Sequence, residues 1–487
     1  MSANLNQTNI EVNDPNFQQA FSQLQGNILK GHGRDHSRHV FFSFTGDKEA
    51  NRKWVSKQAE QVTSTLEQNK QQISFKENGV IHLFMNLMLS STGYNQLGID
   101  ENEWPSDKAF RSGMKDLSTR FDTLPRGDHS PTANPLNDDV SQWETGFRED
   151  VDGMVLLALG GLNDEQAELK LEQEVKKLEQ SMAGTAQIIF VQKGHVMRNE
   201  KKQVIEHFGF VDGVSNPKFL FSELNEEFKN GGYSKNDPSA PLNTVMVRDP
   251  GGDENGYGTY VVYRKLQQNI KGFWERLDIL ANTLSETSSE KVDAEYAGAL
   301  CVGRFKDGTP ISEQGKDGWT NLFNNFNYDD DSDGLRCPFH SHTRKTNPRG
   351  DTVRQFNSPP TIERSRRIVR RGISFGSTNL EPTSEWTDAG LLFISLQADI
   401  VDQFIFMQNT WCNNEGFVRQ ATGTDPLVGQ VKPGSEPMAQ KWSTSWGNPN
   451  AEQVDFSFSG FVKNLGGEYF FMPSLSFLRS LSNESSE

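Results

Sequence analysis

An order of strand-like and helix-like segments that occurs twice along the 487 residues is the strongest constraint on the fold. In the first half, apolar runs and helical stripes alternate as strand, helix, strand, strand, helix and strand. These segments cover residues 39–44, 55–66, 80–89, 154–159, 164–182 and 187–191. Such an order is typical of the split βαβ arrangement of a ferredoxin-like sheet.

The second half repeats the plan with different residues. A strand at 260–263 precedes a helix whose apolar stripe runs from 266 to 280, and a strand at 391–396 precedes a helix striped from 400 to 411. Two further strands, 455–462 and 468–472, fit either sheet. We therefore expect an α+β protein with two ferredoxin-like domains packed together. The expected boundaries are a loose N-terminus (1–20), a first domain (21–205) and a second domain (206–487), with the C-terminal strands free to return to the first.

Charge and hydropathy exclude several classes of protein. The formal charge of −16 argues against a general nucleic-acid binder and against adhesion to an anionic membrane. No apolar run approaches the 18 residues of a transmembrane helix, and the N-terminus lacks the basic and apolar regions of a secretion signal. Three scattered cysteines do not form a disulfide framework. These features predict a cytoplasmic protein.

One window of this acidic chain is strongly basic. Residues 336–371 contain ten Lys or Arg and only two acids, Asp351 and Glu363, so the window carries +8. An isolated basic window usually binds an anion. The histidines at 340 and 342 suggest that this anion carries a metal, and haem, with an iron and two propionates, fits that description. We expect the second domain to supply most of the haem site.

Three stretches carry candidate chemistry: 207–217, with Asp212 between two glycines, the Cys-Pro-Phe run at 337–349, and 368–376, with Arg370 in an apolar context. Taken alone, the first is most often a simple Asx-turn. In this order, and together with Leu-Gln-Gly-Asn-Ile-Leu-Lys at 24–30 and the runs at 390–397 and 403–411, they resemble the dye-decolorizing peroxidase family, in particular its longer bacterial and fungal members. The resemblance covers most of the chain.

The resemblance implies duplicated ferredoxin-like sheets and one haem b per chain. Carried over by position, it assigns the proximal iron ligand, the distal acid–base, the distal arginine, two residues near the peroxide channel and a propionate partner. These are, in that order, His342, Asp212, Arg370, Leu391 with Phe393, and Arg344. A proximal imidazole needs an acceptor for its other N–H, and Asp425 is a candidate.

Two positions depart from the family pattern. His340 stands where a small residue is usual, so it competes with His342 as ligand. Ser374 replaces a proline, which predicts a looser turn around Arg370. Trp411 and Tyr263 are candidates for oxidation of bulky dyes near the surface, although a core role is the alternative for each.

Two other patterns permit a metal interpretation and a simpler one. His32 and His36 are four residues apart, but the flanking glycines favour a structured loop. The acidic run at 329–333 resembles a calcium loop, but His340 occupies the position of the bidentate glutamate, which favours a solvated loop.

The sequence thus predicts a haem peroxidase that uses hydrogen peroxide, by way of an oxoferryl intermediate, to oxidise aromatic and phenolic compounds and dyes in one-electron steps. Asp212 as the base predicts an acidic optimum, because free aspartate titrates near ~3.9 and free histidine near ~6.5. The alternatives are a haem-binding or haem-handling protein with weak turnover, and a nucleic-acid or phosphoprotein binder without haem. We expect no membrane partner; a homo-oligomer is compatible with the sequence.

Overall fold

The computed structural model describes residues 3–116, 118, 136–288, 291–319, 324–431 and 434–482. Its strands are β1 (His36–Phe44), β2 (Phe84–Leu89), β3 (Gly153–Leu159), β4 (Ala186–His195), β5 (Met197–Arg198), β6 (Val204–Ile205), β7 (Val247–Arg248), β8 (Tyr257–Gln268), β9 (Val369–Arg370), β10 (Ile373–Gly376), β11 (Ala389–Gln397), β12 (Gln440–Ser443), β13 (Gln453–Phe456) and β14 (Val462–Met472).

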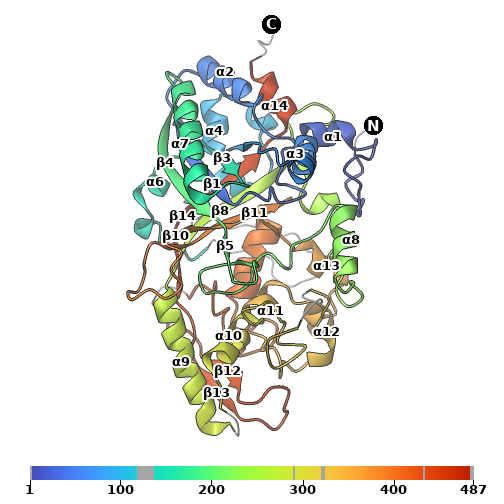
Figure 1. Cartoon of the computed structure of the whole chain (residues 1–487), viewed down its shortest axis with the longest axis vertical. Coiled ribbons are helices and arrows are strands. Elements are labelled where there is room, and N and C mark those ends of the chain that lie inside the picture. The colour runs from blue at the N-terminus through green and yellow to red at the C-terminus, as the bar shows by residue number, and fades with distance from the viewer. Residues whose placement is uncertain are drawn as a thin grey trace.

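Helices cover both ends of the molecule (Figure 1). They are α1 (Gln18–Gln23), α2 (Lys48–Gln58), α3 (Thr65–Asn78), α4 (Ser91–Gln96), α5 (Lys108–Ser112), α6 (Thr145–Arg148), α7 (Asp164–Ser181), α8 (Phe221–Lys229), α9 (Ile270–Thr287), α10 (Ala294–Val302), α11 (His342–Thr346), α12 (Asp351–Phe356), α13 (Pro360–Ser365) and α14 (Leu475–Ser480). Two π-helical segments, Ile400–Ile405 and Met407–Cys412, follow β11.

Two four-stranded antiparallel sheets form the centre of the fold. The first has the order β2-β3-β1-β4 and the second the order β10-β11-β8-β14, which is the same ferredoxin-like order twice. The sheets meet at two seams, and one residue pair joins them at each: Phe471 with Leu89, and Ser374 with His195. Because both edges are joined, the eight strands close into a barrel. The expected α+β fold with two ferredoxin-like halves is confirmed.

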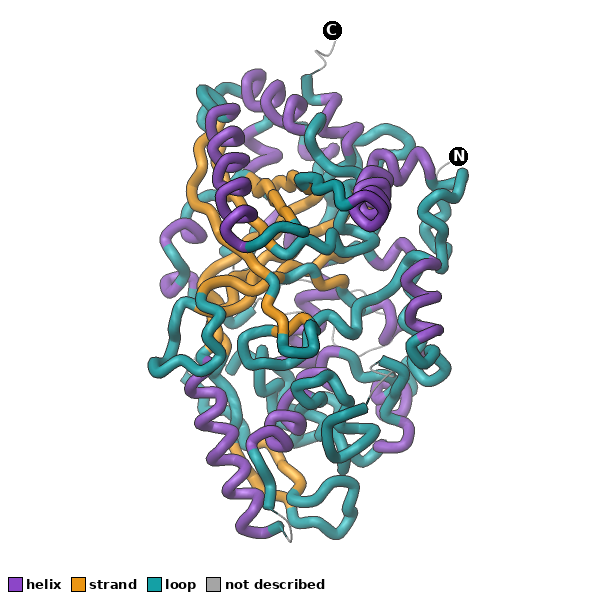
Figure 2. The backbone as a smooth tube through the Cα atoms, viewed as in Figure 1, coloured by secondary structure: helices purple, strands orange, loops and turns teal. Residues whose placement is uncertain are grey.

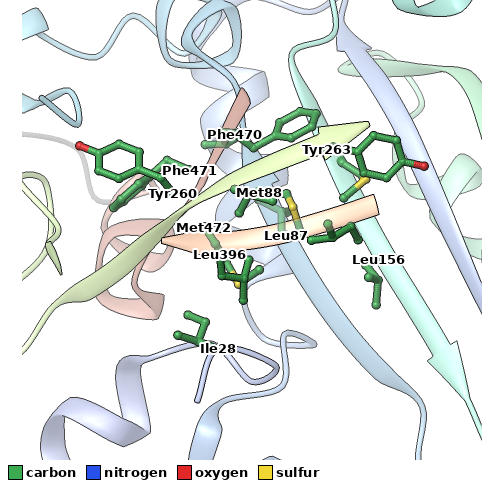
Figure 3. Close-up of a cluster of buried hydrophobic side chains, with 14 of the residues drawn as sticks. Ile28, Leu87, Met88, Leu156, Tyr260, Tyr263, Leu396, Phe470, Phe471 and Met472 are labelled. Carbon is green, nitrogen blue, oxygen red and sulfur yellow. The ribbon is translucent and has the colours of Figure 1, made fainter. Parts of the chain in front are cut away.

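Aromatic and aliphatic side chains from both sheets fill the region between them. Phe41 of β1 contacts Tyr263 of β8, with ring centroids 5.0 Å apart, and Phe470 of β14, with ring centroids 6.3 Å apart. Figure 3 shows side chains of β2, β3, β8, β11 and β14 meeting in one buried cluster. A continuous core of this kind holds the two halves together more firmly than the short seams can.

Helix α7 illustrates how the sequence places a helix on this barrel. Asn163 caps it by accepting a hydrogen bond from the backbone N–H of Gln166. Ala167, Leu171 and Leu178 lie on one stripe and are buried, and each buried leucine contributes about 1.5–3 kcal/mol. Figures 1 and 2 show α7 beside the barrel with α2 and α4, whereas α9 to α12 lie at the other end of the molecule.

The structure corrects two expected helices. The helix expected over 55–66 is two helices, because α2 ends at Gln58 and α3 starts after Ser64, whose side chain accepts from the N–H of Glu67. Leu266 belongs to β8 and not to the helix after it, since the strand continues to Gln268. β8 is buried on both faces over most of its length, so its last apolar residue continues the apolar pattern of the helix that follows.

Both ends of the described chain are held against the rest of the fold. Residues 3–20 are not loose: the backbone of Ile10 pairs with the carbonyl of Phe219 and the N–H of Phe221, and Ile10 and Phe17 are buried. Residues 1–2 lie outside the described part. At the other end β14 pairs along β8 and touches β2, and α14 lies against α2 through a hydrogen bond from the Ser56 hydroxyl to the Arg479 carbonyl. The domain boundary at residue 205 stays a prediction.

No helix among the described residues combines the length and the apolar character needed to span a bilayer.

Candidate active site

A cavity of about 560 Å³ lies beside the second sheet, and it brings together residues that are far apart in the sequence. Its wall includes the face of β8 and β11, helix α11, and the loop between β6 and α8. Five of the six residues singled out from the sequence line this cavity. They are Asp212, His342, Arg370, Leu391 and Phe393.

His342 is the first residue of α11, and its ring is held by a carboxylate. Nδ1 lies 2.8 Å from Oδ2 of Asp425, the candidate acceptor, whose side chain is fully buried. Burial alone would raise the pKa of Asp425, but the His342 ring and the N–H groups of Leu427 and Val428 hold that pKa below its ordinary value. The carboxylate fixes the tautomer, so Nε2 is the nitrogen left for a metal.

Helix α11 is anchored from behind. Ser341, immediately before it, donates a hydrogen bond from its hydroxyl to the carbonyl of Leu300 in α10. The hydroxyl of Thr346 donates to the carbonyl of His342. These contacts place the His342 backbone rigidly at the cavity wall.

Arg370 and Asp212 form the second constellation. Arg370 Nη1 donates to Asp212 Oδ1 over 2.9 Å, and both side chains remain about one-third exposed. Arg370 lies in β9. Both β9 and β10 pair with β11, and they do so in the same register, so the two short strands follow one another along β11. Asn216 binds the Arg370 backbone twice, accepting from its N–H (3.0 Å) and donating to its carbonyl (3.3 Å).

The loop that carries Asp212 is built around a buried glutamate. Glu206 accepts hydrogen bonds from the N–H groups of Phe208 and Phe210 and from the side chain of Gln268. Burial raises the pKa of Glu206 to about 7. Gly209, at φ +90°, makes the tight turn between these donors, a conformation that other residues rarely adopt. Glu206 therefore ties the loop to β8 of the sheet.

Three arginines that sequence reasoning missed line the same cavity: Arg304, Arg349 and Arg367. Arg349 donates to neutral groups, namely the carbonyls of Asn324 and Phe326 and the side chains of Asn324 and Ser215. Burial, and then the charge of Arg304, lower the pKa of Arg349 to about 9. A buried arginine cluster of this kind is stabilised by an anion, and the two propionates of haem fit the site. Only the basic window as a whole indicated this in the sequence.

Arg344 does not line the cavity, which corrects its assignment as propionate partner. Its guanidinium is 1% exposed and binds two buried carboxylates, Asp331 at 2.8 Å and Asp351 at 2.7 Å. Asp331 also accepts from the N–H groups of Arg336 and Cys337, so this part of the acidic run is a buried structural tie and not a solvated loop. With its charge already neutralised, Arg344 has little to offer a second anion.

The two departures from the family pattern also find their places. His340 is buried against Trp442, with ring centroids 4.3 Å apart, and does not line the cavity, so His342 is the candidate ligand. Ser374 lies in β10 opposite Leu391 and not in a turn. Trp411 and Tyr263 are 4% and 0% exposed, which favours the core role for both.

Leu391 and Phe393 enter the cavity from β11. They are two residues apart, so they share a face of the strand, opposite Leu266 and Arg264 of β8. The site thus offers one free imidazole nitrogen, a carboxylate paired with a guanidinium, apolar walls and a cationic end. Such a set can hold an anionic metal cofactor and move a proton beside it.

Two protein-family models match the chain. The DyP dimeric alpha+beta barrel domain matches residues 23–197, and the C-terminal domain of Dyp-type peroxidases matches residues 203–422. Among curated relatives, the multifunctional dye peroxidase DyP2 of Amycolatopsis sp. is 33% identical over 94% of this chain and 95% of its own length. The dye-decolorizing peroxidase msp1 of Mycetinis scorodonius is 29% identical over 94% of this chain and 87% of its own length.

Solved structures agree with these matches. The crystal structure of a DyP-type peroxidase of Anabaena sp. covers 98% of both chains with a TM-score of 0.86 and 40% identity. The DyP2 structure from Amycolatopsis sp. covers 98% of this chain and 99% of its own with a TM-score of 0.84 and 31% identity.

Proposed function

Since the chain belongs to the dye-decolorizing peroxidase family and is a peroxidase, we propose that it binds one haem b and uses hydrogen peroxide to oxidise aromatic and phenolic compounds. One observation supports this most directly: His342, Asp212 and Arg370 line a single cavity although 158 residues separate the last two in sequence.

His342 would hold the iron through Nε2, with Asp425 as the acceptor for Nδ1–H. Arg349, with Arg304 and Arg367 nearby, would neutralise the propionates in place of Arg344. When bound, haem supplies a redox-active iron that takes oxidising equivalents from peroxide and passes them on as single electrons.

Asp212 takes the proton from one oxygen of hydrogen peroxide and returns it to the other, so that water can leave. Arg370 stabilises the negative charge that develops on the departing oxygen, and its ion pair with Asp212 keeps both groups at the same point of the wall. Leu391 and Phe393 restrict the space beside this pair and exclude water. A carboxylate base remains active in mild acid where imidazole would be protonated, which predicts an acidic optimum.

The test combines a spectrum with a variant. The purified protein, supplied with haem, should show the visible absorption of a histidine-ligated haem, and His342→Ala should weaken or displace it. Asp212→Asn should keep the absorption and slow the reaction with peroxide by about 10²- to 10⁴-fold. Unchanged peroxide kinetics of Asp212→Asn at mildly acidic pH would refute the assigned role.

A cytoplasmic location, the absence of nucleic-acid and membrane partners, and a homo-oligomer remain proposals. Light scattering of the purified protein tests the last of them.

A further inference from the structure

Residues 24–30, which stood out in the sequence, have no part in the wall of the cavity. They lie instead against Arg371, the residue that follows Arg370 in the chain. Arg371 Nε donates to the carbonyl of Asn27 over 2.7 Å, and its Nη2 donates to the carbonyl of Ile28 over 3.2 Å. These two nitrogens lie on one edge of the planar guanidinium, so a single side chain binds two consecutive carbonyls from the first half of the chain.

The third nitrogen of the same guanidinium returns to the backbone of Arg370. Nη1 of Arg371 donates to the Arg370 carbonyl over 3.0 Å, and the backbone N–H of Arg371 donates to the carbonyl of Ile394 in β11 over 2.7 Å. Because side chains alternate along a strand, Arg370 faces the cavity while Arg371, which does not line it, points to the other side. Arg371 therefore connects the Arg370 backbone to residues 24–30 from behind the site.

Strand β9, which carries Arg370, is too short to fix its own position firmly. It has two residues, and each makes one pair with β11. The Asn216 side chain also binds the Arg370 carbonyl, but over 3.3 Å, a longer bond than the one from Arg371. Hydrogen bonds from a charged donor are stronger than those from a neutral amide. Arg371 is thus the stronger of these two restraints on the Arg370 carbonyl.

Residues 24–30 form a firm support for the guanidinium. The Gln68 side chain of α3 accepts from the N–H of Asn27 over 2.6 Å and donates to the carbonyl of Lys30 over 3.0 Å. Asn27 has a φ of +71°, a left-handed conformation that asparagine adopts more readily than most residues. The side chain of Ile28 is buried in the apolar cluster of Figure 3. Carbonyl groups held in this way can fix the position of a cation that binds them.

We propose that Arg371 is a positioning residue for the reaction with peroxide: by binding residues 24–30, it keeps Arg370 within hydrogen-bonding distance of Asp212. The inference rests on the proposed haem peroxidase function, in which Arg370 stabilises charge on the departing oxygen. It gives residues 24–30 a role, since they support the Asp212–Arg370 pair from the first half of the chain. A lysine offers one nitrogen in place of three, so it can replace only part of this arrangement.

The test measures fluoride binding to the ferric haem-loaded protein, an equilibrium that requires no turnover. Fluoride is a small anion that binds ferric haem and accepts hydrogen bonds, so its affinity responds to the position of a guanidinium beside the iron. Arg371→Met removes all three side-chain hydrogen bonds, and we expect the Kd for fluoride to rise by about 10-fold. Arg371→Lys, which keeps a charged donor, should recover part of the affinity.

Arg52 provides a matched control. Its Nε and Nη2 donate to the carbonyls of Leu97 and Gly98, each over 2.7 Å, so one edge of its guanidinium binds two consecutive carbonyls as in Arg371. Arg52 lies in α2 and does not line the cavity. Arg52→Met should lower the midpoint of thermal unfolding by an amount similar to that of Arg371→Met, yet leave the Kd for fluoride unchanged.

A double variant tests the support itself. Gln68→Met removes hydrogen bonds that hold residues 24–30, and it should raise the Kd for fluoride by less than Arg371→Met does. Because both changes act through the same contacts, Gln68→Met should have no further effect once Arg371 has been replaced. Gln68→Met and Arg371→Lys also decide the question if Arg371→Met does not fold, since each should then weaken fluoride binding by itself.

Three results would overturn the inference. They are a wild-type Kd for fluoride in Arg371→Met or, if that variant does not fold, in Gln68→Met and Arg371→Lys; an equal rise of the Kd in Arg52→Met; and full additivity of Gln68→Met and Arg371→Met. Failure of the proposed function would look different, because the wild-type protein would then show neither haem absorption nor a response to fluoride.

Discussion

Nδ1 of His342 lies 2.8 Å from a carboxylate oxygen of Asp425, and that carboxylate is completely buried. The buried position means that water cannot compete for the bond, and the two backbone N–H groups on Oδ1 fix the direction of the acceptor. A carboxylate acceptor strengthens the imidazole as an electron donor to a metal. His342 is therefore presented to the cavity in one tautomer and one orientation.

Replacing Asp425 with Asn should weaken this support. A neutral amide is a poorer acceptor, so we expect haem affinity or peroxide turnover to fall by about 10- to 100-fold. Haem titration followed by peroxide kinetics per bound haem separates the two effects. The control is Asp455→Asn. Asp455 is an exposed residue of β13 that pairs with Lys441, and its replacement should change neither haem affinity nor turnover. Wild-type affinity and turnover in Asp425→Asn would contradict this account of the pair.

Arg344 and Arg349 lie in the same basic run but should respond differently to substitution. Arg344→Met leaves Asp331 buried without its cation and Asp351 with Arg354 alone, and we expect a loss of about 3–5 kcal/mol in the free energy of unfolding. Arg349→Met leaves only neutral partners behind, so stability should fall less while haem affinity falls more. Urea unfolding and haem titration of both variants check this, and the reverse ranking would restore Arg344 as the propionate partner.

Asn216 should control the reaction with peroxide without touching the reactants. Asn216→Ala removes both bonds to the Arg370 backbone, which lets the guanidinium shift from its position beside Asp212. A displacement of about 1 Å can slow a reaction by about 100-fold, and we expect haem binding to stay intact. Stopped-flow mixing with peroxide measures the effect. Asn216→Asp, which keeps the acceptor for the Arg370 N–H, should recover part of the rate; equal rates in the two variants would exclude positioning.

Much of the fold could be predicted because several of its strands are continuous apolar runs. The runs at 39–44, 154–159 and 391–396 correspond to β1, β3 and β11, and the stripe Ala167, Leu171 and Leu178 to α7. Helix ends were harder to place. The stripe from Val55 to Leu66 continues through a break that only the Ser64 cap reveals. A stripe records which side chains are buried, and two helices on one surface can share it.

The candidate site also contains some residues that could be predicted from the sequence and others that could not. His342, Asp212 and Arg370 were found because each belongs to a distinctive motif. Which arginine of the basic window lines the cavity was not predictable from the sequence. Arg344 and Arg349 are only five residues apart, and they differ in the groups that the folded chain places next to them. For Arg344 these are Asp331 and Asp351; for Arg349 they are carbonyl groups. The buried pair of Asp138 and Arg264 in the cavity wall left no signal in the sequence either, because 126 residues separate the two.

Stability should depend on pH through a histidine that is remote from the cavity. Burial, and then the charge of Arg38, lower the pKa of His39 from 6.5 to about 3. Below pH 6.5 the unfolded chain binds a proton at this histidine and the folded chain does not. The stabilising contribution is therefore complete above pH 6.5 and is lost as the pH falls toward 3, at about 1.4 kcal/mol per pH unit.

His39→Gln removes this titration and keeps hydrogen-bonding groups near Ser37 and Tyr263. Between pH 6 and 4.5 the free energy of unfolding of the wild-type protein should fall more steeply than that of the variant, by about 1.4 kcal/mol per pH unit. Urea unfolding at several pH values gives both slopes. Parallel slopes would contradict this account, because they would mean that His39 takes up its proton in the folded protein as readily as in the unfolded one. A charged imidazole buried beside Ser37 and Tyr263 would need a carboxylate partner.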